Sequence, residues 1–121
     1  VLIHALMDAL LGAAGLQDIG YYFPPEDDAY KGISSMILLK HVNSLLKERG
    51  LEAYNIDIMV ISETPKLKPH IDTMKANLQS VLEIPLERIS IKATTNEMLG
   101  AIGRREGIAA QAVVSVYEGE I

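Results

Sequence analysis

His4 and Asp8 lie one helical turn apart near the start of the chain, in the segment HALMDALLGAAG at residues 4–15. At positions i and i+4, both side chains project from one face of the helix expected over residues 1–14. Two interpretations stay open. The pair is structural, as a local hydrogen bond or as a core histidine satisfied by a carboxylate, or His4 is a metal ligand beside a site carboxylate. One histidine cannot hold zinc, because a catalytic zinc takes about three protein ligands. Further ligands would have to precede Val1 or come from another subunit.

The segment KATTNE, residues 92–97, ends a predicted strand with two hydroxyls, an amide and a carboxylate. Hydroxyls and backbone N–H groups at a strand end suit phosphate oxygens, and Glu97 could hold Mg²⁺ against a diphosphate. A second interpretation fits equally well. Thr94 or Thr95 would then cap a short helix, and Glu97 would complete a capping box.

A proline-bearing loop, SETPKLKP at residues 62–69, follows another predicted strand. Its prolines stiffen the backbone, and a stiff loop can bind a flat base through backbone groups. The pattern alone favours a plain strand-to-helix connection with solvated lysines. The segment GRREG, residues 103–107, fits either a tight turn or an anion site.

Hydrophobic periodicity predicts helices and strands that alternate along the chain. Ser35 is expected to cap the second helix, and Gly50 to end it. Residues 16–34 are expected to form a long loop, and EIPLER and residues 95–107 to be turns that could each hold a short helical turn. The predicted helices cover residues 1–14, 35–49 and 69–82, and the predicted strands cover 55–61, 88–94 and 108–118. The first helix, apolar on nearly every side, is expected to be buried. These elements predict a single α+β domain over residues 1–121, with one mixed sheet covered by helices.

Composition narrows the function classes. The 121 residues are 49% hydrophobic and carry a net charge of −5, with 11 basic residues in no long run. We therefore expect no nucleic-acid partner. No cysteine is present, so disulfides and thiolate metal sites are excluded. No apolar run is long enough to span a membrane, and no signal peptide is recognised. We expect a bacterial cytoplasmic or a plastid protein, and the uncapped first helix leads us to expect residues before Val1.

Several motifs then occur together, in order: HALMDALLGAAGLQDIG, FP, KG, PK…PHI, IKATT.E, LG and GR.EGIAA. From residue 1 to about residue 117 the chain closely resembles the 2-C-methyl-D-erythritol 2,4-cyclodiphosphate synthase family of the non-mevalonate isoprenoid pathway. The resemblance implies a metal-dependent phosphorus–oxygen lyase that is a homotrimer, with active sites between neighbouring subunits. Its reaction converts 4-diphosphocytidyl-2-C-methyl-D-erythritol 2-phosphate into the cyclodiphosphate and CMP. The 2-phosphate attacks the β-phosphorus, without a covalent enzyme intermediate.

The resemblance also implies metal ligands and catalytic residues. His4 matches the third ligand of the family's zinc, whose other two ligands, in a D-x-H motif, would precede Val1. Asp8 matches a carboxylate that helps to order this site, and Thr95 matches a residue that contacts the phosphates at the transition state. Glu97 matches the ligand of a second cation, Mg²⁺ or Mn²⁺.

The substrate-binding residues are likewise implied by resemblance. Asp18, Ile19 and Gly20 match the residues that bind the methylerythritol hydroxyls. The 23–27 loop continues that pocket. Residues 62–68 match the cytidine pocket, and 93–97 the phosphate end; Arg104 matches a residue at the central cavity of the trimer. The loop positions are Phe23, Pro24, Pro25, Glu26, Asp27, Ser62, Glu63, Thr64, Pro65, Lys66, Leu67, Lys68, Ala93, Thr94, Thr95, Asn96 and Glu97.

Some positions depart from the family pattern. Pro25 stands where the family has an Asp, and Glu26 or Asp27 is the candidate to replace that acceptor. Ala101 and Ile102 replace a usual Phe and Thr, which puts an isoprenoid ligand of the central cavity in doubt but not the main reaction. The alternatives to the enzyme are a non-catalytic trimeric module that binds a small ligand, and an inactive fragment.

Overall fold

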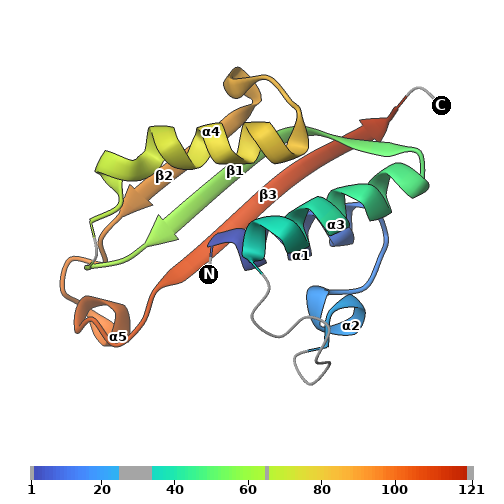
Figure 1. Cartoon of the computed structure of the whole chain (residues 1–121). Coiled ribbons are helices and arrows are strands. Elements are labelled where there is room, and N and C mark those ends of the chain that lie inside the picture. The colour runs from blue at the N-terminus through green and yellow to red at the C-terminus, as the bar shows by residue number, and fades with distance from the viewer. Residues whose placement is uncertain (1, 25–33, 65, 120–121) are drawn as a thin grey trace.

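The computed structural model describes residues 2–24, 34–64 and 66–119, and its strands form one mixed three-stranded sheet (Figure 1). The strands are β1 Leu51–Ile61, β2 Ile89–Thr94 and β3 Ala109–Glu118, in the order β2-β1-β3. β1 runs parallel to β2 and antiparallel to β3. The predicted mixed sheet and the α+β class are therefore confirmed.

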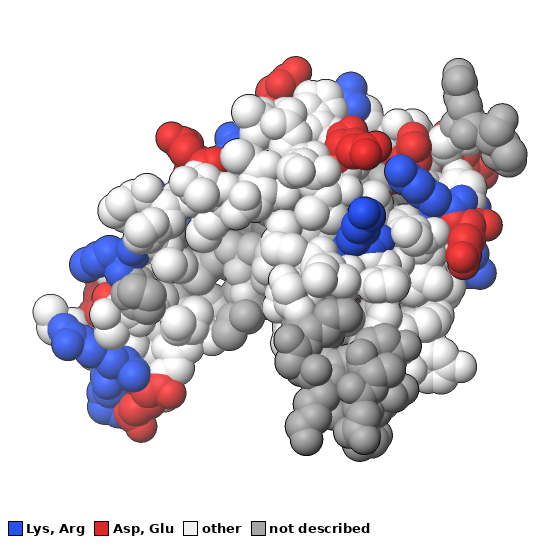
Figure 2. All heavy atoms as spheres, in the orientation of Figure 1, with Lys and Arg blue, Asp and Glu red and all other residues white. Residues whose placement is uncertain are grey.

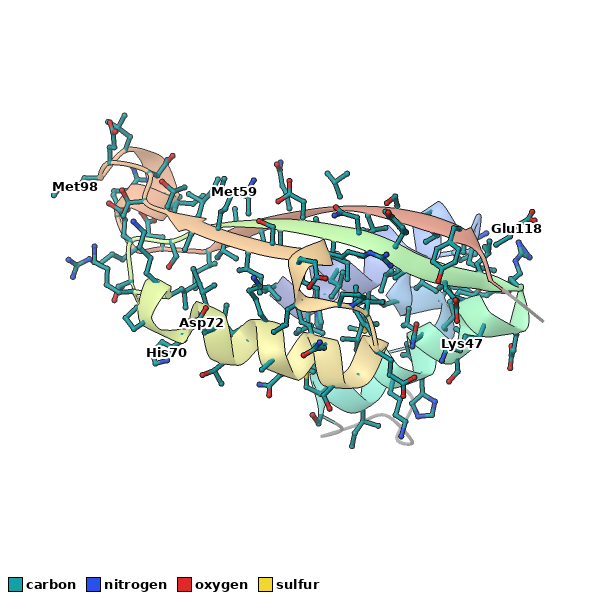
Figure 3. The ribbon with its side chains drawn as sticks, turned by 90° about the horizontal axis from the view of Figure 1, so that it is seen from above. Lys47, Met59, His70, Asp72, Met98 and Glu118 are labelled. Carbon is teal, nitrogen blue, oxygen red and sulfur yellow. The ribbon has the colours of Figure 1, made fainter. Side chains whose placement is uncertain are left out.

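Helices α1 Leu2–Ala13, α3 Ser35–Glu48 and α4 Ile71–Leu82 all cover the same face of this sheet (Figure 3). The core lies between the two layers, because alternate strand residues and one stripe of each helix are apolar. Its fully buried side chains include Leu6, Leu10, Leu39, Val42, Leu46, Ile56 and Ile58. Every helix in the described part of the chain is too short or too polar to cross a membrane.

Helix α1 is buried on one side only, so the prediction of a wholly buried helix was wrong. Leu6 and Leu10 are completely buried, whereas His4, Asp8 and Gly12 are exposed. These three exposed residues follow each other at spacings of four and form one stripe along the helix. The packing of α1 therefore presents the histidine and the carboxylate to the outside of the molecule.

Several element boundaries differ from those predicted, among them the following three. Helix α3 is capped by Ser34 rather than Ser35, because the Ser34 Oγ accepts the Met36 N–H at 3.2 Å. Strand β1 begins at Leu51, directly after Gly50 at φ +73°, and a register shift at Ala53/Asn55 keeps it paired with β3. The 3₁₀ turn Lys68–His70 precedes α4, which begins two residues later than expected.

The short helical turns have mixed outcomes. The expected turn within EIPLER is the 3₁₀ segment η3 Leu86–Arg88, and the one expected in 95–107 is α5 Gly100–Gly103. The loop predicted over 16–34 instead contains α2 Ile19–Tyr22. Asp18 caps α2, since its Oδ1 accepts the Tyr21 N–H at 3.0 Å.

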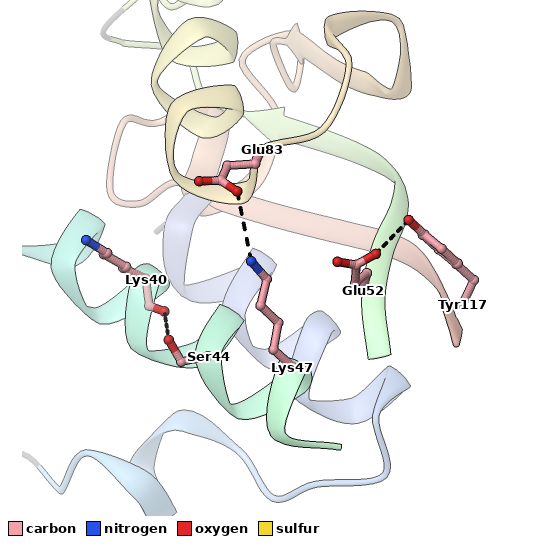
Figure 4. A network of polar contacts seen from close by, with 6 residues as sticks. All are labelled: Lys40, Ser44, Lys47, Glu52, Glu83 and Tyr117. Atoms are coloured by element: carbon pink, nitrogen blue, oxygen red, sulfur yellow. Dashed lines mark hydrogen bonds and ion pairs between the residues drawn. The ribbon is translucent and has the colours of Figure 1, made fainter. Parts of the chain in front are cut away.

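Polar contacts link the ends of α3, α4 and the sheet far from the loops that follow β1 and β2 (Figure 4). Lys47 Nζ lies 4.0 Å from Glu83 Oε2, which joins the last turns of α3 and α4. The Tyr117 hydroxyl donates to Glu52 Oε2 at 2.8 Å, across β3 and β1. The side chains of Lys47 and Glu83 are both exposed, so their ion pair contributes little to the free energy of unfolding.

The opposite face of the sheet carries no helix in the described structure (Figure 3). Val113 is 72% exposed there. Asp57 and Lys92 also lie on this face, with Lys92 Nζ 3.0 Å from Asp57 Oδ1. That oxygen is buried and receives no well-aligned hydrogen bond, so the ammonium charge is its only compensation among the described residues.

Candidate active site

The loops that follow β1 and β2 meet at one edge of the sheet (Figure 1). The two strands are parallel, so their carboxyl ends lie side by side, a common position for ligand sites. The Ser62 N–H donates to the Thr94 carbonyl at 2.9 Å and extends the pairing beyond Ile61. Figure 2 shows Lys and Arg side chains gathered over the neighbouring α5.

A pocket of about 220 Å³ opens between these two loops. It unites two segments that the sequence offered as separate candidates, 62–68 and 92–97. A plain connection between a strand and a helix is therefore an incomplete description of residues 62–68. The described residues that line the pocket are Ser62, Lys66, Leu67, Lys68, Ala93, Thr94 and Thr95.

The wall of the pocket is held by Ser62 and Thr95. Ser62 is only 6% exposed, and its Oγ donates to the Thr64 carbonyl at 2.9 Å, which fixes the start of the loop. The Thr95 Oγ1 accepts the Glu97 N–H at 3.3 Å. Lys66 and Lys68 are exposed and line the pocket, so their ammonium groups give it positive charge.

No capping box forms at residues 94–97. Helix α5 begins only at Gly100, and its N-cap, Leu99, makes no side-chain capping bond. Residues 95–99 form a loop in which Glu97 and Met98 have φ of 51° and 63°. Such left-handed backbone is strained in residues other than glycine and is frequent at functional sites.

Glu63 contacts the second loop rather than pointing free into the pocket. Its Oε2 accepts the Asn96 N–H at 2.9 Å, and its Oε1 accepts the Met98 N–H at 2.8 Å. With Thr95 bonded to Glu97, three consecutive N–H groups are occupied by protein acceptors. These amides are therefore not free for phosphate. The Thr94 hydroxyl already donates to the Thr95 carbonyl at 3.4 Å, so the Thr95 hydroxyl and the ammonium groups of Lys66 and Lys68 are the side-chain donors that remain among the described lining residues.

The exposed stripe of α1 forms a second group of predicted residues. Asp8 Oδ1 accepts the Ile19 N–H at 2.9 Å and so fixes the start of α2 beside Gly20. Within the described ranges no hydrogen bond or ion pair joins His4 to Asp8, so the local-pair interpretation is wrong. The described lining of the pocket contains no residue of α1 or α2.

The described side chains limit where a metal ion could bind. The described residues contain no group of three His, Cys, Asp or Glu side chains that could hold a metal ion. His4 is exposed and able to act as one ligand, but the described chain does not supply a zinc site by itself. Glu97 is exposed, and one carboxylate with substrate phosphates is a sufficient donor set for Mg²⁺.

The remaining predicted site residues are scattered. The Phe23 ring lies 6.1 Å from that of His41, at the end of α2. Arg104 caps α5 and forms an ion pair with Glu106. The candidates Pro25, Glu26, Asp27 and Pro65 lie outside the described residues.

Sequence reasoning missed the contacts that shape the site. The spacing of Glu63 from Asn96 and Met98 is 33 and 35 residues, so no local pattern indicates that they meet. Gly103 opens the GRREG segment expected to be a tight turn or an anion site, and neither expectation includes its contact with Met98: a Cβ at Gly103 would lie 2.1 Å from the Met98 carbonyl carbon. The one usable signal was that two polar loops follow strands expected in one sheet.

Fold and site together define an α+β domain with a small-molecule pocket at the carboxyl ends of two parallel strands. The chain belongs to the YgbB family, whose sequence model matches residues 1–117. A curated relative from Thermosynechococcus vestitus, named 2-C-methyl-D-erythritol 2,4-cyclodiphosphate synthase, is 55% identical over 119 residues, 98% of this chain and 74% of the relative. The family resemblance inferred from the motifs is thus confirmed.

Solved structures agree. The bifunctional IspDF from Campylobacter jejuni matches with a TM-score of 0.90 and 46% identity, over 94% of this chain and 31% of that chain. The CDP complex of IspF from Plasmodium falciparum matches with a TM-score of 0.84 and 31% identity, over 98% of this chain and 70% of that one.

Proposed function

We propose that this chain cyclises 4-diphosphocytidyl-2-C-methyl-D-erythritol 2-phosphate to 2-C-methyl-D-erythritol 2,4-cyclodiphosphate and CMP. The observation that carries the proposal is the pocket that unites the 62–68 loop with Thr94 and Thr95. Relatives that share half of the sequence are named for this reaction, and the P. falciparum relative was solved with CDP.

In this proposal the 62–68 loop binds the cytidine through backbone groups. Ser62 is buried and bonded to Thr64, so its loop needs little reorganisation when the base enters. Lys66 and Lys68 attract the diphosphate, and the hydroxyls of Thr94 and Thr95 contact it. Thr95 bonds through its oxygen to the Glu97 N–H, which leaves its O–H free to donate to a phosphate oxygen.

The chemical step needs positioning and charge stabilisation rather than a protein nucleophile. An oxygen of the 2-phosphate attacks the β-phosphorus, and the bond from that phosphorus to the bridging oxygen breaks. CMP leaves with the bridging oxygen. Thr95 donates a hydrogen bond to the charge that develops on the phosphate oxygens.

Two cations complete the proposal. Glu97 would hold Mg²⁺ or Mn²⁺ together with the substrate phosphates, and this ion supplies charge neutralisation when bound. His4 would be one ligand of a zinc whose other ligands lie outside the described residues. Asp8 would keep residues 18–20 in place for the methylerythritol hydroxyls, through its bond to Ile19.

We also propose a homotrimer in which each active site lies between two subunits. The α1–α2 group and the pocket share no described lining residue, so a neighbouring chain would bring the two groups together. The uncovered face of the sheet, with Val113 and the Asp57–Lys92 pair, is the proposed contact surface. The proposal rests on the lack of helix cover over this face in the described structure rather than on the single valine, because isolated exposed apolar residues are common on monomer surfaces.

The variant Thr95→Val tests the catalytic assignment. Loss of one hydrogen-bond donor to the developing charge is expected to lower kcat by about 100-fold. The matched control is Thr73→Val on the exposed side of α4, which should keep wild-type activity. CDP binding without CMP release by the wild type would favour a non-catalytic binding module. Equal activity in both variants would contradict the role of Thr95.

A further inference from the structure

We propose that Glu63 is a positioning residue that holds the 95–99 loop, and through it Thr95 and Glu97, in the geometry of the active site. The inference rests on the proposed function of the pocket. It assigns Glu63 a role through other residues instead of a contact with the nucleotide.

The carboxylate of Glu63 spans two backbone amides that flank Glu97. One oxygen accepts the Asn96 N–H at 2.9 Å and the other accepts the Met98 N–H at 2.8 Å. An ionised carboxylate accepts without donating, so both oxygens match N–H partners. Hydrogen bonds to a charged acceptor are stronger than those between neutral groups. This is a bridge between two loops, with Glu63 on the loop that follows β1.

The loop held by this bridge would not keep its shape unaided. Glu97 and Met98 are consecutive left-handed residues without glycine's freedom, at φ of 51° and 63°. Such backbone persists only where surrounding contacts determine it. Met98 has no burial to hold it, because it is 81% exposed and points away from the body of the molecule (Figure 3).

Several further contacts restrain the same loop without reaching the loop that follows β1, among them the Leu99 N–H, which donates to the Asn96 carbonyl at 3.0 Å. Asn96 Nδ2 donates to the Leu99 carbonyl at 2.7 Å, which closes the loop on itself. Gly103 packs against the Met98 backbone so closely that a Cβ would lie 2.1 Å from the Met98 carbonyl carbon. Among the described side chains, Glu63 alone ties this loop to the loop that follows β1.

The position of Glu63 gives the bridge a consequence for catalysis. Ser62, next to it, lines the pocket, while the bridge ends on either side of Glu97. Glu63 therefore connects the base-binding loop to the proposed cation ligand and to Thr95, whose hydroxyl oxygen binds the Glu97 N–H. Without the Glu63 carboxylate, the 62–68 loop keeps its own Ser62–Thr64 hydrogen bond. The 95–99 loop, however, is no longer held at a fixed position relative to the 62–68 loop.

The first experiment measures the bridge itself. Amide hydrogen exchange is followed by NMR in the wild type, Glu63→Ala, Glu63→Gln and the control Glu87→Ala, an exposed carboxylate in η3. Glu63→Ala should speed exchange of the Asn96 and Met98 amides by at least about 10-fold, and Glu63→Gln should keep the protection of one amide. Unchanged protection of both amides in Glu63→Ala would overturn the proposal.

The second experiment measures what the bridge does. Glu63→Ala is expected to weaken Mn²⁺ binding in the presence of CDP, followed by electron paramagnetic resonance, by about 10- to 100-fold. It should lower kcat by a similar factor, with the affinity for cytidine itself unchanged. Wild-type kcat and Mn²⁺ affinity in Glu63→Ala would overturn the positioning role and leave the proposed function intact. Absence of CMP release by the wild type would instead refute the proposed function, whatever the exchange data show.

Discussion

The carboxylate of Asp8 accepts the backbone N–H of Ile19 at 2.9 Å, so the helix that presents His4 also fixes the start of α2. This bond joins residues 11 positions apart and places a capped turn inside a segment that otherwise reads as loop. Helix α1 therefore positions both His4, the proposed zinc ligand, and residues 18–20, the proposed contacts of the methylerythritol hydroxyls.

Replacement of Asp8 by Ala is expected to free the start of α2. The loss of one hydrogen bond to a charged acceptor at an exposed site corresponds to about 1 kcal/mol, or roughly a fivefold rise in KM. CDP binding should not change, because the described pocket lining contains no residue of α1 or α2. Kinetics and calorimetry with CDP separate the two effects, and Glu48→Ala is the control. A loss of CDP affinity equal to the rise in KM would contradict this division.

Substitution of Gly103 by Ala is expected to displace the 95–99 loop. The new Cβ would lie 2.1 Å from the Met98 carbonyl carbon and 2.6 Å from its Cα, so backbone must move. Overpacking of this kind costs about 1–3 kcal/mol in the free energy of unfolding. Gly107→Ala is the matched control, since nothing lies within 4 Å of its Cβ position. Urea denaturation measures the free energy of unfolding of both variants. Equal values for Gly103→Ala and Gly107→Ala would contradict the prediction, because they would mean that the 95–99 loop moves without cost.

Replacement of Glu83 by Gly is expected to stabilise the protein. Glu83 ends α4 in a left-handed conformation, φ 58° and ψ 42°, which costs a non-glycine residue about 1–2 kcal/mol. Glycine also raises the conformational entropy of the unfolded chain, which offsets part of this gain in the free energy of unfolding. The exposed ion pair with Lys47 contributes little, so we expect a net gain of about 0.5 kcal/mol. Glu83→Ala removes the pair and keeps the strain, so it should not stabilise. Thermal unfolding that ranks Ala above Gly would contradict the argument.

Charge on the uncovered face of the sheet is expected to break the proposed trimer. Val113→Lys would place an ammonium group at a side chain that is 72% exposed in one chain and buried in the proposed assembly. Sedimentation velocity should shift from trimer to monomer, with loss of CMP release. The control Ser80→Lys, on the exposed side of α4, should leave the assembly unchanged. A monomeric wild type would refute the assembly itself.

The sequence predicted those parts of the fold that local patterns encode. The β-branched run at 55–61 and the alternation at 88–94 gave two strands of the sheet, and the apolar stripe at 36–46 gave α3. The start of β1 was missed because Glu52 and Tyr54 interrupt the apolar pattern before Asn55, and pairing with β3 extends the strand back to Leu51. Helix α2 has one local signal, its N-cap Asp18, but the Ile19 N–H also donates to Asp8, and no spacing encodes that tertiary hydrogen bond.

The site divides in the same way. Motifs identified the two loops around the pocket, because each holds polar residues directly after a strand. Their union depended on the parallel pairing of β1 and β2, which sequence order alone does not determine. The bridge from Glu63 to Asn96 and Met98 belongs to this second class, since its partners meet only in the folded chain.

The central claim is that the pocket between the 62–68 and 94–95 segments processes a cytidine diphosphate substrate. The most direct measurement is ³¹P NMR of the purified protein with 4-diphosphocytidyl-2-C-methyl-D-erythritol 2-phosphate, zinc and Mg²⁺. The account predicts that the substrate signals are replaced by those of the cyclodiphosphate and CMP, and that Thr95→Val slows this conversion while Thr73→Val does not. Unchanged substrate signals in the presence of the metal-loaded wild type would contradict it.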